Sequence, residues 1–221
     1  MKRISLFLAA AVALLAASCS SMYVAKSDPS ELVDDLLLIE PVSVIELLTD
    51  EEMAVIDDDL SRENSEIVSE IILGRPGYFH VTDDAILTAD TTQDLLAFYN
   101  TLISSSKKYK PLVPVPGSIK SIIEASGKRY ALCVVSHGFS RTKRNYRREV
   151  VRDIGIAILT LGSTVRVTNK NIYDPTVFII DSQTGNVVFF NHMEPRTFDP
   201  LDRNKVSIFL TQLFSRYKWT R

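Results

Sequence analysis

The hydrophobic residues of this 221-residue chain fall partly into short continuous runs between polar stretches. Apolar runs bounded by Pro, Gly or polar clusters are typical of buried strands. We therefore expect strands at residues 36–40, 42–48, 78–81 and 130–136, with an acidic loop over residues 49–59. The first should end at Pro41, because proline cannot donate to a sheet ladder, and the second is expected at a sheet edge.

Other stretches repeat their apolar residues at the spacing of one helix face. They predict helices over residues 60–72, 92–103, 118–123 and 206–217. Gly74 and Pro76 should stop the first helix, and Thr92 and Ser118 are the expected caps of the next two. A further segment, between 150 and 161, is apolar on both faces, which predicts a mostly buried helix, with a strand as the alternative.

Two runs rich in β-formers, residues 176–181 and 187–191, flank a short turn that contains Gly185. This arrangement predicts a β-hairpin. Strands interleaved with helices in this order predict an α/β (α+β) fold, a mixed β-sheet with helices packed on it. The length suits a single domain over residues 31–221.

The amino terminus follows a different pattern, in which Lys2 and Arg3 precede an apolar run over residues 4–17. That run has about 14 residues, whereas a spanning helix needs roughly 20, so a secretory signal is expected. Small residues then lead to Cys19. This sequence resembles the lipobox of bacterial lipoproteins, in which the thiol is acylated with palmitate and the chain is cut just before it. Ala16 stands where that family prefers a branched apolar residue, and an ordinary secretion signal is the alternative.

The lipoprotein resemblance implies that residues 1–18 are a signal peptide and that Cys19 carries the lipid anchor. In that family an Asp after the cysteine tends to retain the protein in the inner membrane. Ser20 and the acid-free residues that follow it therefore imply the outer membrane, on the periplasmic side. Residues 19–30 would form a flexible tether. About 11 such residues average roughly 18 Å and reach no more than about 40 Å, which keeps the domain close to the lipid.

Charge is distributed unevenly along the chain. Residues 28–70 hold fifteen acids and one base, a net charge of −14, whereas residues 102–152 hold twelve bases and two acids, a net charge of +10. Such asymmetry indicates either an interaction surface or two segments that neutralise each other or form separate solvated faces.

The strongest candidate site is a basic segment, expected to be a loop over residues 138–146 that runs into the following helix. Its composition suits phosphate or an anionic membrane surface, and we expect it to contact anionic envelope material or an acidic partner protein. Pairing with the chain's own acids is the alternative. Nucleic acid is not expected outside the cytoplasm. The candidate anion-binding residues are Arg141, Lys143, Arg144, Arg147, Arg148 and Arg152.

Candidate catalytic chemistry is sparse. His80, His137 and His192 lack the spacing of a zinc site, and no cofactor motif occurs. One alternative function is a hydrolase in which His137 is a general base beside Ser136 or Ser140, with His192 or Asp181 nearby. The Gly-x-Ser-x-Gly elbow of such enzymes is absent. Cys133 lies in an apolar run and is expected to be a buried single thiol, so a disulfide framework is excluded.

A proline after the first apolar strand, a hairpin written Asp181-x-x-Thr184-Gly185-x-Val187 and a closing helix resemble a group of envelope domains. The group includes the amino-terminal domain of the Tol translocation protein, the curli-secretion lipoprotein and lipoprotein activators of penicillin-binding proteins. It implies a small α/β scaffold that binds partners. We therefore expect a non-catalytic partner-binding or assembly module at the outer membrane. A subunit of a homo-oligomeric secretion assembly is a further alternative.

Overall fold

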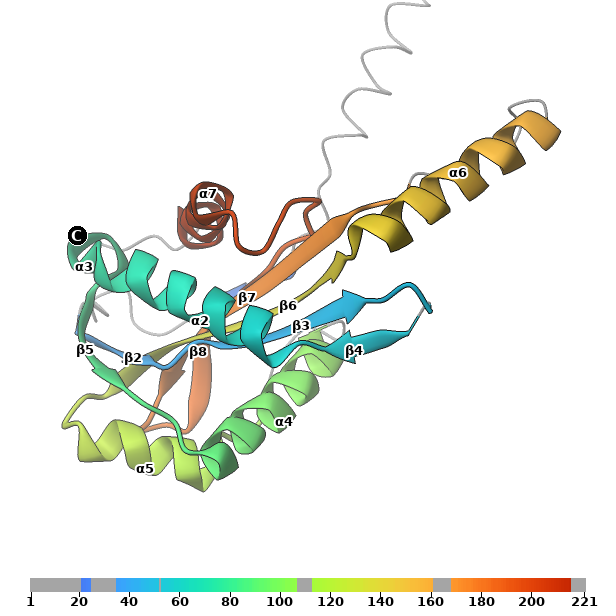
Figure 1. Cartoon of the computed structure of the whole chain (residues 1–221). Helices are drawn as coiled ribbons and strands as arrows, with labels where there is room; N and C mark the ends of the chain where they lie inside the picture. Colours follow the sequence, from blue (N-terminus) through green and yellow to red (C-terminus); the bar gives the residue numbers. More distant parts are fainter. Residues whose placement is uncertain (1–20, 25–34, 52, 107–112, 161–167, 216–221) are drawn as a thin grey trace, which may run out of the picture.

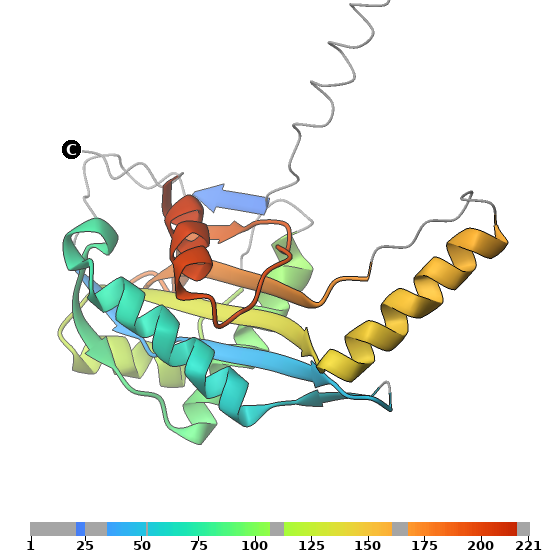
Figure 2. The ribbon, with the colours of Figure 1, turned by 45° about the horizontal axis from the view of Figure 1, so that its top comes forward.

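A computed structural model describes residues 21–24, 35–51, 53–106, 113–160 and 168–215. They form one mixed sheet with helices on both faces, so the predicted α/β class is confirmed. Helices α2, α3 and α7 lie over one face, and α4 and α5 cover the other (Figure 1). The remaining helix, α6, extends away from these layers in both ribbon views (Figures 1 and 2).

The sheet has eight strands, and its main path runs β1-β8-β7-β6-β2-β5, with β3 and β4 joined to it through β6. The long strand β6 is central, since it pairs in parallel with β2 and β3 and antiparallel with β7. The strand bounds are β1 Ser21–Val24, β2 Leu36–Ile39, β3 Val42–Leu48, β4 Ala54–Ile56, β5 Val81–Ala85, β6 Tyr130–Arg141, β7 Asn171–Asp181 and β8 Asn186–His192.

Strands β2 and β3 follow one another along the same side of β6. Leu36 pairs with Tyr130 at one end and Leu48 with Arg141 at the other. Pro41 lies in the gap between them, so the predicted strand end before the proline is confirmed. On its other side β3 pairs with β4 only through residues 46–48, which leaves its first half at the edge of the described sheet, as expected.

The helices begin and end for local reasons that the sequence supplies. In α2 the Asp57 carboxylate accepts from the Leu60 amide at 3.0 Å, and Gly74 closes the helix. Thr92 is not a cap, because α4 begins three residues earlier and the Thr92 amide donates to the Thr88 carbonyl. The helix bounds are α2 Asp58–Leu73, α3 Pro76–Phe79, α4 Ala89–Ser106, α5 Gly117–Ala125, α6 Lys143–Leu159 and α7 Arg203–Ser215.

Alternating side chains of the central strands supply two cores, one on each face of the sheet. Leu132 and Val134 of β6 pack under α2 and α7, whereas Cys133 and Val135 pack under α4 and α5. Cys133 is fully buried and free, as expected. Burial in an apolar surrounding raises its thiol pKa, which keeps it unreactive.

Three local predictions are resolved by the structure. The hairpin is confirmed, with Gly185 at a positive φ of 65° in the turn between β7 and β8. The strand predicted at residues 78–81 is wrong, because Pro76 starts the short helix α3 and the strand β5 begins only at Val81. Residues 49–59, expected to be an acidic loop, contain the short strand β4.

Candidate interaction site

The first turn of α6 is fixed to the body of the protein by side-chain hydrogen bonds. Thr142 caps the helix by accepting from the Asn145 amide at 3.1 Å, and its hydroxyl donates to Asp50 at 2.8 Å. The buried Asn145 side chain donates to the Thr49 carbonyl at 2.6 Å and accepts from Arg141 at 2.8 Å. The basic segment predicted as a loop is therefore the end of β6 followed by an anchored helix.

The side of α6 that faces the body is polar. Its buried residues are Asn145, Glu149 and Asp153, which recur every fourth position and so share one face. Glu149 binds Arg152 of the same helix, and Asp153 accepts from Thr168, just before β7. Hydrogen bonds and ion pairs, not an apolar stripe, thus connect α6 to the domain.

The opposite side of α6 is apolar toward the end of the helix and remains exposed. The exposed fractions are 69% for Val151, 54% for Ile154, 69% for Ile158 and 85% for Leu159. The prediction of a mostly buried helix is therefore wrong. These four apolar residues point away from the sheet, whereas Val150, Ile156 and Ala157 are half-buried.

The six predicted anion-binding cations divide into two sets. Arg141 lies in β6, donates to the Asn169 carbonyl at 2.9 Å and stacks on Phe139, and Arg152 binds Glu149. The other four are exposed along the outer side of α6, before its apolar end. Arg144 lies 3.6 Å from Asp50, and no carboxylate of the described chain pairs with Lys143 or Arg147. The outward stripe, meaning Lys143, Arg144, Arg147, Arg148, Val151, Ile154, Ile158 and Leu159, is cationic near the body and apolar beyond.

A second exposed apolar surface lies on the hairpin of β3 and β4, which projects from the same end of the molecule as α6 (Figure 1). Met53, Val55 and Ile56 are each about half exposed. In the part of the chain that the structure describes, β4 pairs only with β3, so its outer edge is open. Exposed acids border it at Glu46, Glu51, Asp58 and Asp59.

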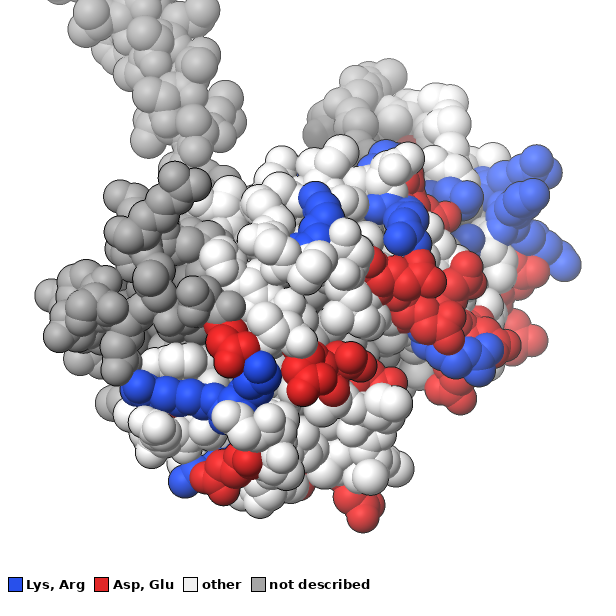
Figure 3. Space-filling view, turned by 90° about the vertical axis from the view of Figure 1, so that its left-hand side faces the viewer, with Lys and Arg blue, Asp and Glu red and all other residues white. Residues whose placement is uncertain are grey.

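These two surfaces hold most of the exposed apolar bulk. Seven of the eleven large apolar side chains exposed in the described residues lie on α6 or on the hairpin, which makes this end of the molecule the candidate binding surface. Sequence reasoning missed the hairpin, although the apolar residues 53–56 inside an acidic stretch were the available signal. Charges also remain segregated elsewhere, since Asp and Glu gather in groups beside groups of Lys and Arg (Figure 3).

A cluster of titratable side chains lies on the α4 side of the sheet. The His137 ring stacks on Tyr99, with centroids 5.1 Å apart. Thr176 Oγ1 lies 2.9 Å from His192 Nδ1, which in turn lies 3.5 Å from Asp174 Oδ1 without hydrogen-bond geometry. Burial lowers the pKa of both histidines and raises the pKa of Asp174 to about 6.

This cluster does not assemble the hydrolase considered from the sequence. His137 and His192 come together, but Ser136 Oγ lies on the other face, 3.0 Å from the Tyr173 hydroxyl. Ser140 donates to Asn171 at 2.9 Å, and Asp181 binds Arg129 at the far end of β7. Among the described residues, no group of three His, Cys, Asp or Glu side chains could hold a metal ion.

Cys19 and the tether over residues 19–30 lie almost wholly outside the described residues, apart from Ser21–Val24, which pair with β8 as strand β1. None of the described helices combines the length and hydrophobicity that crossing a bilayer requires.

No protein-family description matches the chain, and no curated protein matches it. Among solved structures, the chain is similar to the PelC dodecamer from Paraburkholderia phytofirmans, with a TM-score of 0.40 and 11% identity over 89% of this chain and 95% of that one. A single-site variant of that PelC dodecamer, in another crystal form, gives a TM-score of 0.41 and 10% identity over 90% and 96%. Likeness at this level supports no conclusion about function.

Proposed function

We propose that the protein is an envelope lipoprotein, held at the outer membrane by acylated Cys19, which acts by binding as an assembly module. In the assembled state, α6 of one copy docks on the β3–β4 hairpin of a second copy. The observation that carries the proposal is the outward stripe of α6, which exposes four large aliphatic side chains beyond a row of cations.

The apolar half of the stripe supports a docking role. Burying exposed aliphatic surface against a partner would gain about 25 cal/mol of free energy for each Å² removed from water. A contiguous exposed patch of this kind is typical of an interaction site. With a rise of 1.5 Å per residue, a helix of this length extends about 25 Å, enough to reach a neighbouring copy.

The hairpin supports the choice of a second copy as the partner. Like α6, it combines exposed apolar residues with a charged border. The border of the hairpin is acidic, whereas the border of the α6 stripe is basic. Complementary charge around an apolar contact fixes orientation and excludes wrong partners. An anionic lipid surface would attract the cations of α6 but repel the acids of the hairpin, which projects from the same end.

The predicted anchor also favours self-association. Because Ser21 already pairs with β8, Cys19 is only two positions before the sheet, a reach of about 7 Å that would hold every copy in one thin layer along the membrane. Such confinement raises the effective concentration of one copy around another, so a contact of modest affinity would be occupied.

Disulfide crosslinking of the full-length protein in its own membrane tests this assembly. Two differently tagged chains are co-expressed, one carrying Ile158→Cys and the other Val55→Cys. Both positions are exposed, and the native Cys133 is buried, so it does not compete. We expect a mixed-tag disulfide dimer, because the docked geometry brings the end of α6 onto β4.

The matched control replaces Ile158→Cys by Ile86→Cys, another exposed aliphatic position, which is far from α6 in the sequence. This pair should give no mixed dimer. Equal crosslinking in both pairs, or none in either, would contradict the assembly. A fluorophore on Ile158→Cys that shifts to the blue with anionic vesicles, in place of a crosslink, would identify the membrane as the true partner of α6.

A further inference from the structure

The groove between residues 195–198 and α7 lies away from the α6 and hairpin surface and has features of a ligand site. It is an open groove with a volume of about 560 Å³, within the range of small-molecule pockets. Its inner wall is aromatic, since Phe198 and Phe209 pack edge to face with centroids 6.0 Å apart. The exposed Ile208 forms an apolar rim.

The loop that forms one wall is held in place by the backbone. The Arg196 amide donates to the Tyr173 carbonyl at 2.9 Å, and the Tyr173 amide donates back to Arg196 at 2.8 Å. The Phe198 amide donates to the Arg196 carbonyl at 3.2 Å. Because Tyr173 lies in the central strand β7, this wall is preorganised and not a free loop.

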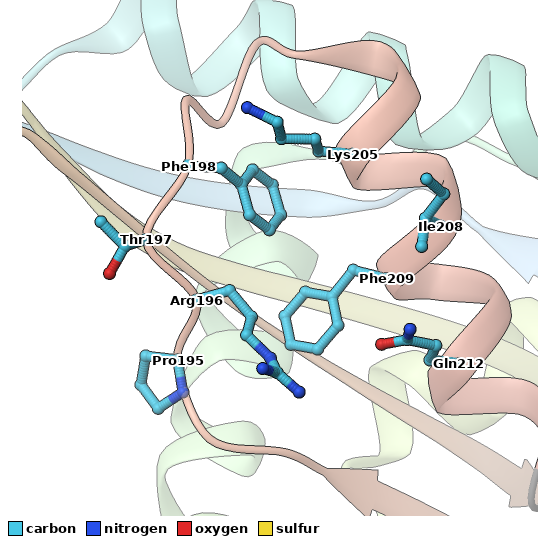
Figure 4. Close-up of a pocket in the computed structure, with 8 residues that line it drawn as sticks. All are labelled: Pro195, Arg196, Thr197, Phe198, Lys205, Ile208, Phe209 and Gln212. Atoms are coloured by element: carbon cyan, nitrogen blue, oxygen red, sulfur yellow. The ribbon is translucent and has the colours of Figure 1, made fainter.

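An exposed cation, Arg196, lies in the groove. The Arg196 guanidinium lies 5.8 Å from the Phe209 ring centroid, and no carboxylate of the described chain lies within ion-pair distance of it. Gln212 extends from α7 beside the Phe209 ring, directed toward that ring and, beyond it, Arg196 (Figure 4). The other cation, Lys205, points past Phe198 and is neutralised by Asp202 at 3.2 Å.

We infer that this groove binds a small amphipathic carboxylate. Its apolar body would lie against Phe198, Phe209 and Ile208, and its carboxylate would meet the Arg196 guanidinium and the Gln212 amide. Guanidinium and amide N–H groups both donate, and a carboxylate only accepts, so the polar end of the groove selects an anion over a neutral analogue. The inference is independent of the assembly through α6.

Binding of naphthalene-2-carboxylate to the full-length protein, followed by amide NMR shifts and calorimetry, tests the site. We expect saturable binding with a dissociation constant on the order of 1 mM, as for a fragment of this size. The shifts should cluster on residues 195–198 and α7. Naphthalene-2-carboxamide has the same shape without the charge and should bind about tenfold to a hundredfold more weakly.

Variants separate the site from general attraction to a cationic surface. Arg196→Gln should weaken the carboxylate about tenfold or more, and so should Ile208→Asp, an exposed substitution that places a repelling charge at the rim. Arg203→Gln removes an equal charge from α7 outside the groove and should leave binding unchanged. Equal binding of carboxylate and carboxamide, equal loss in Arg196→Gln and Arg203→Gln, or shifts confined to α6 and the hairpin would overturn the inference.

Discussion

The Asn145 side chain donates to the Thr49 carbonyl at 2.6 Å, and this bond joins the first turn of α6 to the end of β3. This buried amide, together with the hydrogen bonds from Thr142 to Asp50 and from Thr168 to Asp153, sets the direction of a helix that projects from the domain. The same amide accepts from Arg141 at the end of β6. Both surfaces proposed to meet in the assembly, α6 and the β3–β4 hairpin, are therefore oriented from one point.

Replacing this amide should loosen α6 more than it harms the fold. Asn145→Ala leaves the Thr49 carbonyl and Arg141 without their partner, which costs about 1–3 kcal/mol in the free energy of unfolding. We also expect faster amide exchange along α6, measured by hydrogen–deuterium exchange. Arg144→Ala, one residue away but on the exposed side, should cost less than about 0.5 kcal/mol, since its ion pair with Asp50 is solvated. Equal effects of the two variants would show that Asn145 does not anchor α6.

Charge reversal tests the complementarity of the two surfaces. Lys143→Glu with Arg147→Glu should abolish most of the crosslinking between α6 and the hairpin, because like charges would then meet across the contact. Adding Glu46→Lys and Glu51→Lys on the partner copy should restore it. All four side chains are exposed, so the fold should be unaffected. Loss without recovery in the combined variant would argue against this pairing of surfaces.

The cluster at His137 and Asp174 predicts a pH dependence with a definite sign. Burial raises the pKa of Asp174 to about 6, so between pH 4 and 6 the folded state holds a proton that the unfolded chain has released. The fold therefore loses stability through this group as pH rises through that window, on the order of 3 kcal/mol in total. The lowered pKa values of His137 and His192 act in the opposite direction, because the fold loses the stability that the two neutral rings contribute as pH falls below 6.5.

Asp174→Asn isolates the carboxyl contribution, because both histidines remain in wild type and variant. We expect the variant to be more stable than the wild type above pH 6 and about equally stable near pH 4, in urea denaturation across that range. A difference in stability that does not change with pH would mean that the Asp174 carboxyl is not perturbed by burial.

The sequence was sufficient to predict those elements whose structure is determined by a local pattern of residues. The apolar run before Pro41, the helix end at Gly74 and the turn at Gly185 were predicted because each depends on residues within a few positions. The alternating burial along β6 follows in the same way from strand geometry.

The candidate surfaces depended on tertiary information that the pattern lacks. Apolar residues on both faces of the segment 150–161 predicted a buried helix. Which face of α6 meets the domain is determined by contacts with Thr49, which is distant in the sequence, and with Thr168, which follows the helix. Asp174 and Thr176 joined the histidine cluster only because β7 pairs with β6 in a register that places Asp174 opposite His137.

Gly138 is the position in β6 where the structure leaves no room for a side chain. A Cβ there would lie 2.5 Å from the Ile172 carbonyl oxygen and 3.3 Å from Ile45 Cδ1, so the strands on either side would have to move apart. We expect Gly138→Ala to destabilise the protein by about 1–3 kcal/mol. Gly155→Ala is the matched control, since nothing lies within 4 Å of its Cβ position in α6, and it should stabilise the helix by about 0.5–1 kcal/mol. The stability of both variants is measured by thermal unfolding. Destabilisation by both substitutions, or by neither, would show that close strand packing at Gly138 does not make that position sensitive to a side chain.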